Sequence, residues 1–419
     1  MFLNKVKDFK QYLLMFLKWS LLSALMGVLG GLLGAVFHHA LEFVTEIRQA
    51  SGWLIFLLPV GGLAIVGLYW LLRLRSNRGT NEIVNAVLEG KAVSPLIAPA
   101  VFLSTVITHL FGGSSGREGA ALQIGGSMAS LLNKLFRLKK DESTMMIICG
   151  MGAVFSGLFS MPLTACLFAL EFESVGTIFS PALLPCFIAS LVANVISSML
   201  GVHPIVGVQI ETVEFTFSTG WRFIVLAVLV ALLGIGMCYT FHKASHLAQR
   251  WIDNPAIRIL AGACVVVALT LLVGDQRFNG AGVELTLQAI NGTTDWYSFI
   301  VKLLFTAVTL AAGFKGGEIV PTFCIGATFG CLIGGWLGLP AGFAAMLGLV
   351  GLFCAVTNSP LASIVLSVEM FGVTNLYIFA LICVITFALS GNFSLYDRQT
   401  FEFSKFSLIR KPKDREEEI

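Results

Sequence analysis

The chain has 419 residues, of which 56% are hydrophobic and 12% are charged, and its formal net charge is +3. Soluble domains average about 25% charged residues, so this chain has too little charge to cover a water-facing surface of its size. The composition excludes a cytosolic enzyme, a nucleic-acid-binding protein and a disordered chain. Because unbroken apolar runs replace the alternating pattern of a transmembrane barrel, the sequence predicts an all-α polytopic membrane protein.

Apolar runs that can span a bilayer follow one another along the chain. A spanning helix needs about 20 apolar residues, and the clearest candidates are 11–37, 53–72, 143–170, 177–201, 221–242, 256–274, 298–313 and 374–391. Shorter segments that contain Gly or Pro lie at 97–112, 119–133, 319–338, 340–356 and 361–372. Short, interrupted segments of this kind are typical of half-helices that end inside the membrane beside a cavity.

The two ends of the chain are more polar than its middle. Lys and Arg near both ends place both termini in the cytoplasm by the positive-inside rule. We therefore expect a cytoplasmic N-terminal segment at 1–10, a transmembrane domain at 11–400 and a solvated cytoplasmic tail at 401–419. The nine cysteines lie in apolar stretches without any CxxC pair, so reduced buried thiols are expected, with no metal and no cofactor.

The sequence repeats itself at an offset of about 200 residues. Glu118, within a Gly-Arg-Glu-Gly motif, corresponds to Glu318, within Gly-Gly-Glu-Ile, in the second copy of the repeat. A phenylalanine stands seven residues before a Pro-Leu pair in each half, and a glutamate stands nine residues after each proline: Phe155, Pro162 and Glu171, then Phe353, Pro360 and Glu369. The repeat predicts two similar halves, about 11–201 and 217–395, around a site near the membrane midplane.

Glu118 is the acidic residue that most requires an explanation. A charge at the bilayer centre costs about 2.5–3.5 kcal/mol on insertion scales. Glu118 ends a Gly/Ser-rich turn and opens an apolar helix, and such a helix start offers free N–H groups and partial positive charge to an anion. A carboxylate there competes with a dissolved anion, and an apolar setting favours its protonated form. The alternative is a structural carboxylate paired with Arg117.

The second half has a similar arrangement around Glu318, with a glutamate at a predicted helix start. Pro321 favours a helix start, so the amides of residues 318–320 are expected to face an anion from the opposite side. Glu318 is either a second gating or proton-carrying group or a partner of Lys315. Tyr396, which follows the last apolar segment, is either an interfacial anchor or a phenol donor to an anion.

Other polar residues in apolar segments have plainer interpretations. Glu171 and Glu369 are interpreted as solvated or paired charges near a membrane boundary. His109 is interpreted as a hydrogen-bonded core histidine rather than a proton relay. The neighbours His38 and His39 do not share a helix face, so a metal site there is not expected.

Taken together, Gly116-Arg117-Glu118-Gly119, the run Gly317–Pro321, the two Pro-Leu helices and Tyr396 resemble the CLC family of anion channels and anion/proton exchangers. The resemblance covers about residues 11–400. It implies a CLC-type fold of two inverted structural repeats with many tilted or partial helices, in a homodimer with one pathway per subunit. It also implies that Glu118 is the gate and outer proton carrier. The expected gating and proton-transfer residues are Glu118 and Glu318, and the expected anion-binding residues are Gly116, Arg117, Gly119, Gly317, Ile319, Val320, Tyr396, Thr80 and Asn81.

Three departures from the chloride-handling members resemble the bacterial fluoride/proton exchanger branch. Thr80 and Asn81 lie where those members carry a Gly-Ser-Gly-Ile-Pro loop, Phe172 lies where exchangers usually carry an inner glutamate, and Lys315 lies in a motif that is usually apolar. Val320 differs from the threonine expected in the fluoride branch, which leaves the polar lining and the coupling open. Fluoride needs a dense set of donors, which Thr80, Asn81 and the Tyr396 hydroxyl could supply.

The resulting hypothesis is a fluoride/proton antiporter that exports fluoride across the plasma membrane, driven by proton influx. The alternative within the family is a chloride or broad-anion/proton exchanger, or a passive anion channel. The expected partners are fluoride or chloride, protons, membrane lipid and a second copy of the chain, with no nucleic acid. An intramembrane enzyme is disfavoured because the sequence offers no nucleophile–base set and no HExxH motif.

Overall fold

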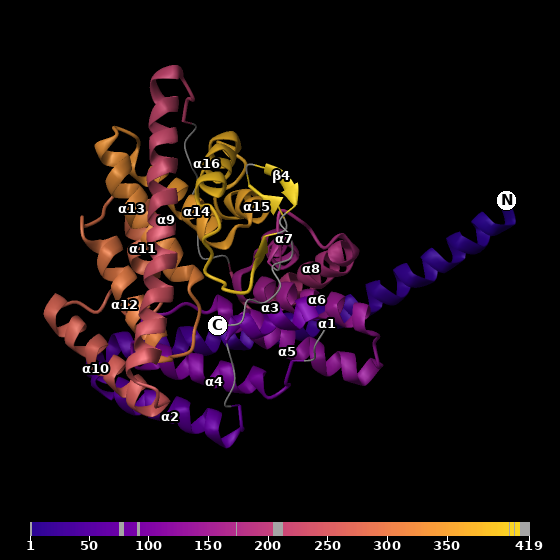
Figure 1. The fold of residues 1–419 in the computed structure, drawn as a ribbon, viewed down its shortest axis with the longest axis horizontal. Coiled ribbons are helices and arrows are strands. Elements are labelled where there is room, and N and C mark those ends of the chain that lie inside the picture. The colour runs from indigo at the N-terminus through magenta and orange to yellow at the C-terminus, as the bar shows by residue number, and fades with distance from the viewer. Residues whose placement is uncertain are drawn as a thin grey trace.

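The computed structural model describes residues 2–74, 79–89, 93–172, 174–203, 213–401, 403–405 and 407–410. Within these ranges the chain is mostly helical, with two very small sheets (Figure 1). The first-half helices are α1 (Phe2–Ala50), η1 (Gly52–Leu57), α2 (Leu58–Leu71), α3 (Thr80–Glu89), α4 (Ile97–Leu110), α5 (Glu118–Phe136), α6 (Lys140–Phe159), α7 (Pro162–Glu171), η2 (Ser180–Ala182) and α8 (Leu183–Met199).

The second half repeats this pattern of long and short helices. Its helices are α9 (Phe217–Trp251), α10 (Pro255–Val273), α11 (Val283–Ile290), α12 (Ser298–Ala312), α13 (Ile319–Trp336), α14 (Ala341–Thr357), α15 (Pro360–Phe371) and α16 (Leu376–Leu389). Strand β1 (Ser174–Val175) pairs in parallel with β2 (Thr400–Phe401), and β3 (Phe403–Ser404) pairs in antiparallel with β4 (Ser407–Arg410). Seven helical segments of the described chain are long and apolar enough to cross a membrane, which confirms the predicted fold class.

The helix boundaries depart from the sequence prediction at both ends of the first half. The first helix begins at Phe2, so residues 2–10 continue α1 instead of forming a separate segment, and its N-terminal part projects from the body in Figure 1. The predicted span 143–170 is wrong, because it is two helices. Ser160 adopts a left-handed conformation (φ 56°) that ends α6, and Pro162 then starts α7.

The second half has the same break between two helices, made by a left-handed residue and a proline. Asn358 is left-handed (φ 56°) after α14, and Pro360 starts α15. Helices α5 and α13 also pack in equivalent ways against α6 and α14. A Cβ atom on Gly125 would collide with the Gly150 carbonyl, and one on Gly326 would lie 2.5 Å from the Gly348 carbonyl oxygen. Small residues at these crossings let the backbones touch, which fixes α5 and α13 rigidly at the centre of the molecule.

Helices α7 and α15 lie side by side and join the two halves. The Glu369 carboxylate at the end of α15 accepts hydrogen bonds from the amides of Leu163 and Thr164, both at 2.8 Å, in the first turn of α7. The Glu171 carboxylate at the end of α7 accepts reciprocally from the first turn of α15, from Leu361 at 3.3 Å and Ala362 at 2.9 Å. Each glutamate therefore caps the helix of the other half, and neither is a solvated charge.

The C-terminal segment also folds back on the helices as far as the structure describes it. The Lys405 ammonium donates hydrogen bonds to Asn358 Oδ1, the Phe387 carbonyl and Ser390 Oγ, at 2.6–2.8 Å. Burial lowers the pKa of Lys405 to about 8. The predicted tail at 401–419 therefore packs on the helices near its start, and residues 411–419 lie outside the described residues.

The reciprocal caps predict a measurable loss of stability. Glu369→Ala leaves two amides of α7 without acceptors, so we expect a cost of about 1–3 kcal/mol and a lower unfolding temperature. Glu369→Gln keeps one acceptor oxygen, so its loss of stability should be smaller than that of Glu369→Ala. Thermal unfolding of the detergent-purified protein, followed by tryptophan fluorescence, measures both. Glu46→Ala, at an exposed position of α1, is the control. An unchanged melting temperature in Glu369→Ala would show that the caps do not stabilise the two halves.

Candidate functional site

The two glutamate motifs of the repeat meet at the centre of the molecule. The Gly116 amide donates to the Gly317 carbonyl at 2.6 Å, and the Gly317 amide donates to the Gly116 carbonyl at 2.9 Å. Helix α5 begins two residues after Gly116, and α13 begins two residues after Gly317. This pair of hydrogen bonds therefore brings together two helix N-termini, each with free amides and partial positive charge.

Glycine is required at both positions of this bridge. A Cβ atom on Gly317 would lie 2.5 Å from Glu118 Oε2 and 2.7 Å from the Gly119 amide nitrogen. A Cβ atom on Gly116 would also collide with the Glu118 carboxylate. The carboxylate of Glu118 thus lies directly against the two glycines, in the space that the two helix N-termini share.

The Glu118 side chain is fully buried, and neither of its carboxyl oxygens has a hydrogen-bond partner in the described part of the chain. The oxygens lie beside the backbone amides of Glu118 and Val320 without hydrogen-bonding geometry. No ion pair joins the carboxylate to Arg117, so the alternative of a structural pair is wrong. Arg117 turns the other way, with Nη1 3.1 Å from His38 Nδ1 and its guanidinium 5.0 Å from the centre of the Phe159 ring.

Helix α3 brings both of its expected residues to this centre. Thr80 Oγ1 would lie 2.9 Å from a Cβ atom on Gly119, so its hydroxyl touches the start of α5. Asn81 Nδ2 lies 3.5 Å from Asp397 Oδ2, next to Tyr396 in the chain. Two polar side chains from α3 therefore lie near the two facing helix starts.

Tyr396 supplies a free donor. Its side chain is buried, its ring lies 4.6 Å from the Phe172 ring between centroids, and its hydroxyl has no partner among the described residues. A buried ring with an unused hydroxyl favours the phenol donor over the interfacial anchor. The charged groups that act most on this hydroxyl are Glu318 and Glu118.

Glu318 does not pair with Lys315 in the described structure. The Lys315 ammonium lies 4.8 Å from the centre of the Tyr69 ring instead. The charged neighbours that act most strongly on Glu318 are Glu118, His242 and Asp397. Glu318 keeps part of its surface exposed, whereas Glu118 is fully buried.

Sequence reasoning missed a second charged pair beside the site. His242 Nε2 of α9 lies 2.8 Å from Asp397 Oδ1, and both side chains are partly exposed. The neighbouring His242 holds the pKa of the Asp397 carboxyl below its usual range. A possible signal was the position of Asp397 directly after Tyr396, but nothing in the sequence links it to His242.

Sequence reasoning also left Lys302 without a role. Its ammonium is fully buried and donates to Ser114 Oγ at 3.0 Å, the Phe278 carbonyl at 3.0 Å and the Gly280 carbonyl at 2.7 Å. Because Ser114 lies in the turn before Glu118, Lys302 fixes the path of that turn. Three neutral acceptors satisfy the donors but leave the positive charge uncompensated by any acid in the described chain.

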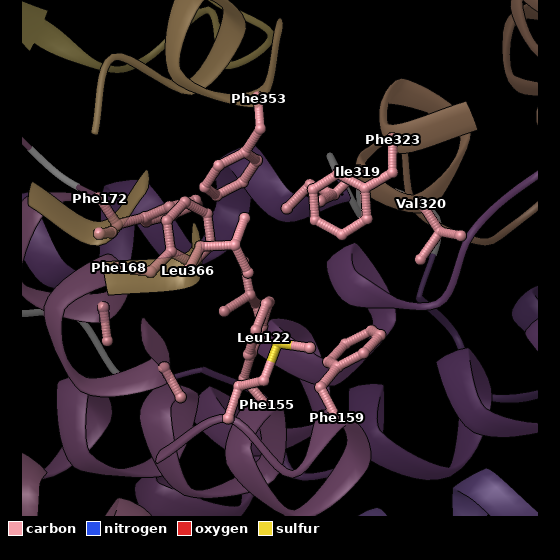
Figure 2. Close-up of a cluster of buried hydrophobic side chains, with 14 of the residues drawn as sticks. Leu122, Phe155, Phe159, Phe168, Phe172, Ile319, Val320, Phe323, Phe353 and Leu366 are labelled. Atoms are coloured by element: carbon pink, nitrogen blue, oxygen red, sulfur yellow. The ribbon is translucent and has the colours of Figure 1, made fainter. Parts of the chain in front are cut away.

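A wall of aromatic rings, drawn around Phe168 and Phe353 in Figure 2, reaches Tyr396 through Phe172. Phe172, where the family resemblance implies that exchangers carry an inner glutamate, is almost fully buried and packs on Phe168 and Tyr396. This wall offers no titratable group. Val320 and Phe323 also line a small apolar cavity of about 20 Å³, roughly the space of one water molecule.

Comparisons with known proteins identify the family of this chain and its fold. A family profile described as "Voltage gated chloride channel" matches residues 68–391. A "chloride/fluoride channel protein" of Pseudomonas syringae pv. tomato is 32% identical over 93% of this chain and 87% of its own length. The crystal structure of a CLC-type fluoride/proton antiporter superposes with a TM-score of 0.89 at 31% identity, covering 92% of this chain and 98% of that one. A slow cyanobacterial Cl⁻/H⁺ antiporter shares the fold, with a TM-score of 0.75 at 20% identity over 89% and 94% of the two chains.

The glycine bridge predicts a strong effect from one added methyl group. Gly317→Ala must displace the Glu118 carboxylate or the start of α5, so we expect anion flux from proteoliposomes to fall about a hundredfold. Gly335→Ala, in the same stretch of chain, meets no atom within 4 Å and should leave flux unchanged while favouring helix α13. Wild-type flux in Gly317→Ala would mean that the carboxylate does not need this contact.

Proposed function

The chain belongs to the CLC family of voltage-gated chloride channels and related anion transporters, and from this membership we propose that it is a fluoride/proton antiporter. It exports fluoride across the plasma membrane in exchange for entering protons. The observation that carries the proposal is the buried Glu118 carboxylate, which lies between two helix N-termini without a hydrogen-bond partner in the described chain.

In the proposed cycle Glu118 alternates between two states. As a carboxylate it occupies the space beside the amides of α5 and α13, where a dissolved anion would otherwise bind. As a neutral acid it is no longer attracted to the positive helix N-termini. It then moves out with its proton and leaves that space to fluoride. One residue thereby links the movement of the two ions, because fluoride and the charged carboxylate exclude each other.

Glu318 is proposed as the second proton-handling group. It interacts electrostatically with Glu118 on one side and with the His242–Asp397 pair on the other. That pair is partly exposed to solvent, whereas the Phe172 position holds no acid. Protons therefore reach Glu118 past Glu318 rather than through the aromatic wall.

The donor set supports fluoride as the anion. The Tyr396 hydroxyl is free, Thr80 and Asn81 lie at the same centre, and the amides of Ile319 and Val320 open α13. We infer that these donors serve one small anion, which would match the strong hydrogen-bond acceptance of fluoride. The solved fluoride/proton antiporter is 31% identical to this chain, and the 32% identical relative is named for both chloride and fluoride.

A chloride or broad-anion exchanger, or a passive channel, is the second candidate. One observation favours it, because the Val320 side chain adds only apolar surface to the small cavity beside α13. An apolar lining holds a large, weakly hydrated halide more readily than fluoride. The family architecture is common to these candidates, so the choice rests on flux measurements.

Orientation and assembly follow from the sequence and the family resemblance. We propose that both termini face the cytoplasm and that two copies form a homodimer with one pathway each. Native mass spectrometry of the protein in lipid nanodiscs measures the number of copies.

Glu118→Gln tests the coupling. The amide keeps the size of the side chain but cannot ionise, so we expect proton transport to disappear and any remaining anion flux to be uncoupled. Parallel fluoride, chloride and proton fluxes from proteoliposomes measure this, with Glu214→Gln, at an exposed position before α9, as control. Proton-coupled flux in Glu118→Gln would rule out the proposed role. Wild-type fluoride efflux without protons, or equal chloride flux, would favour the second candidate.

Val320→Thr tests the selectivity. The hydroxyl adds a donor beside the amides that open α13 at almost unchanged side-chain volume, so the ratio of fluoride to chloride flux should rise about tenfold. Val308→Thr, on the neighbouring helix α12, is the matched control and should leave the ratio unchanged. A constant ratio in Val320→Thr would show that residue 320 does not line the anion path.

A further inference from the structure

A second polar region lies outside the centre described above. A cavity of about 910 Å³ opens between the C-terminal end of α1, the end of α4, the loop 275–282 and the start of α11. Arg117 and His109 line it, so the cavity reaches the turn that carries Glu118. It lies at the end of α1 that is opposite the N-terminus, and it is large enough for hydrated ions.

Arg48 is the unusual residue of this cavity. It lies in the last turn of α1, lines the cavity and is only 6% exposed. Its guanidinium makes no hydrogen bond or ion pair with the described residues, and Nε is buried without a partner. Nη2 would lie 3.1 Å from a Cβ atom on Gly280, so the group packs closely against that loop. An unpaired buried guanidinium is costly, and an anion at its free donors compensates that cost.

Two further cations surround the same space. Arg117 lies on another wall, where one of its nitrogens contacts His38, and Lys302 lies beneath the loop, where it donates to the Gly280 carbonyl. Arg48, Arg117 and Lys302 all act electrostatically on the buried His109. None of the three cations forms an ion pair with an acid in the described chain.

His109 completes the cavity wall with an acceptor. Its Nδ1–H donates to the Thr105 carbonyl at 2.9 Å, which leaves Nε2 as an unprotonated nitrogen. Nε2 is buried and has no partner among the described residues. It can accept a hydrogen bond from a water molecule in the hydration shell of an anion held by the arginines.

The acidic residues of the cavity are arranged differently. Glu42, Glu46 and Glu284 are exposed, and Asp275 pairs with Arg277 together with Asp295. Arg277, the fourth cation of the region, is therefore already neutralised within the protein. Of the four cations, only Arg277 forms ion pairs with acids among the described residues. Glu284 acts on Arg48 only through space, so the Arg48 guanidinium keeps its donors free for an anion.

We propose that Arg48 and Arg117 form an outer binding site for a small monovalent halide anion, at which the anion rests before or after it passes Glu118. The site deepens the proposed function, because it supplies an anion reservoir next to the gate. A charged cleft of this kind raises the local anion concentration and the association rate. Its affinity should fall with ionic strength, because the cavity opens to solvent and dissolved salt screens its charges.

Sided flux measurements on Arg48→Gln test the site. In right-side-out and inverted membrane vesicles, the KM for the transported anion should rise about tenfold on the cavity face and stay unchanged on the other face. The difference should shrink when an impermeant salt screens the cavity. Arg48→Lys keeps the charge and should fall between wild type and Arg48→Gln. An equal KM change on both faces, or no change, would overturn the proposal.

Arg277→Gln is the matched control, because it removes the same charge from the same cavity. Its guanidinium is already paired, so only the long-range field changes and KM should rise no more than about twofold. Equal KM changes in Arg277→Gln and Arg48→Gln would show that the anion responds only to the overall electrostatic field of the cavity. That result would overturn the proposed site.

A third measurement uses the wild-type protein and does not depend on any variant folding. Crystals soaked in bromide should show an anomalous peak within hydrogen-bond distance of the Arg48 or Arg117 guanidinium. The absence of a peak in saturating bromide would overturn the site. This outcome is separate from the transport assay: uncoupled fluoride flux would reject the proposed antiport and leave the bromide result as it stands.

Discussion

Two hydrogen bonds between Gly116 and Gly317 are the constraint on which the rest of the structure depends. They join the two halves of an internal repeat backbone to backbone, so the starts of α5 and α13 share one small space. The partial positive charges at the N-termini of α5 and α13 then act together on the Glu118 carboxylate. Close glycine contacts between α5 and α6, and between α13 and α14, keep the two helix starts from moving apart.

The buried charged groups fall into two classes: those with hydrogen-bond partners in the protein are structural, and those without such partners are candidates for function. Glu171 and Glu369 accept hydrogen bonds from two amides each, and Lys302 donates to three acceptors, so these groups stabilise the fold. Glu118 and Arg48 have no such partner in the described chain. A buried charge without a protein partner is expensive in any fold, and it is tolerated where an ion provides the missing interaction during part of a transport cycle.

The repeat made much of this predictable. Because glutamate is rare in apolar segments, the matching positions of Glu118 and Glu318 identified the centre, and glycine and proline identified the short helices. Other features depend on contacts between distant segments that no local pattern reports. His242 and Asp397 are 155 positions apart in the chain and meet only when α9 packs near the C-terminal segment. The span 143–170 looked continuous because a left-handed Ser160 leaves the hydropathy of the segment unchanged.

Phe172 determines how the two ions can be coupled. An acid at this position would give protons a path of their own beside the anion, but here an aromatic ring packs against Tyr396 and excludes water. Protons and anions must then pass through the same space around Glu118. Coupling in such a design depends on mutual exclusion at one carboxylate, and not on the meeting of two separate routes. We propose that the Tyr396 hydroxyl, which has no partner among the described residues, donates to the anion in one step of the exchange and to the Glu118 carboxyl in another.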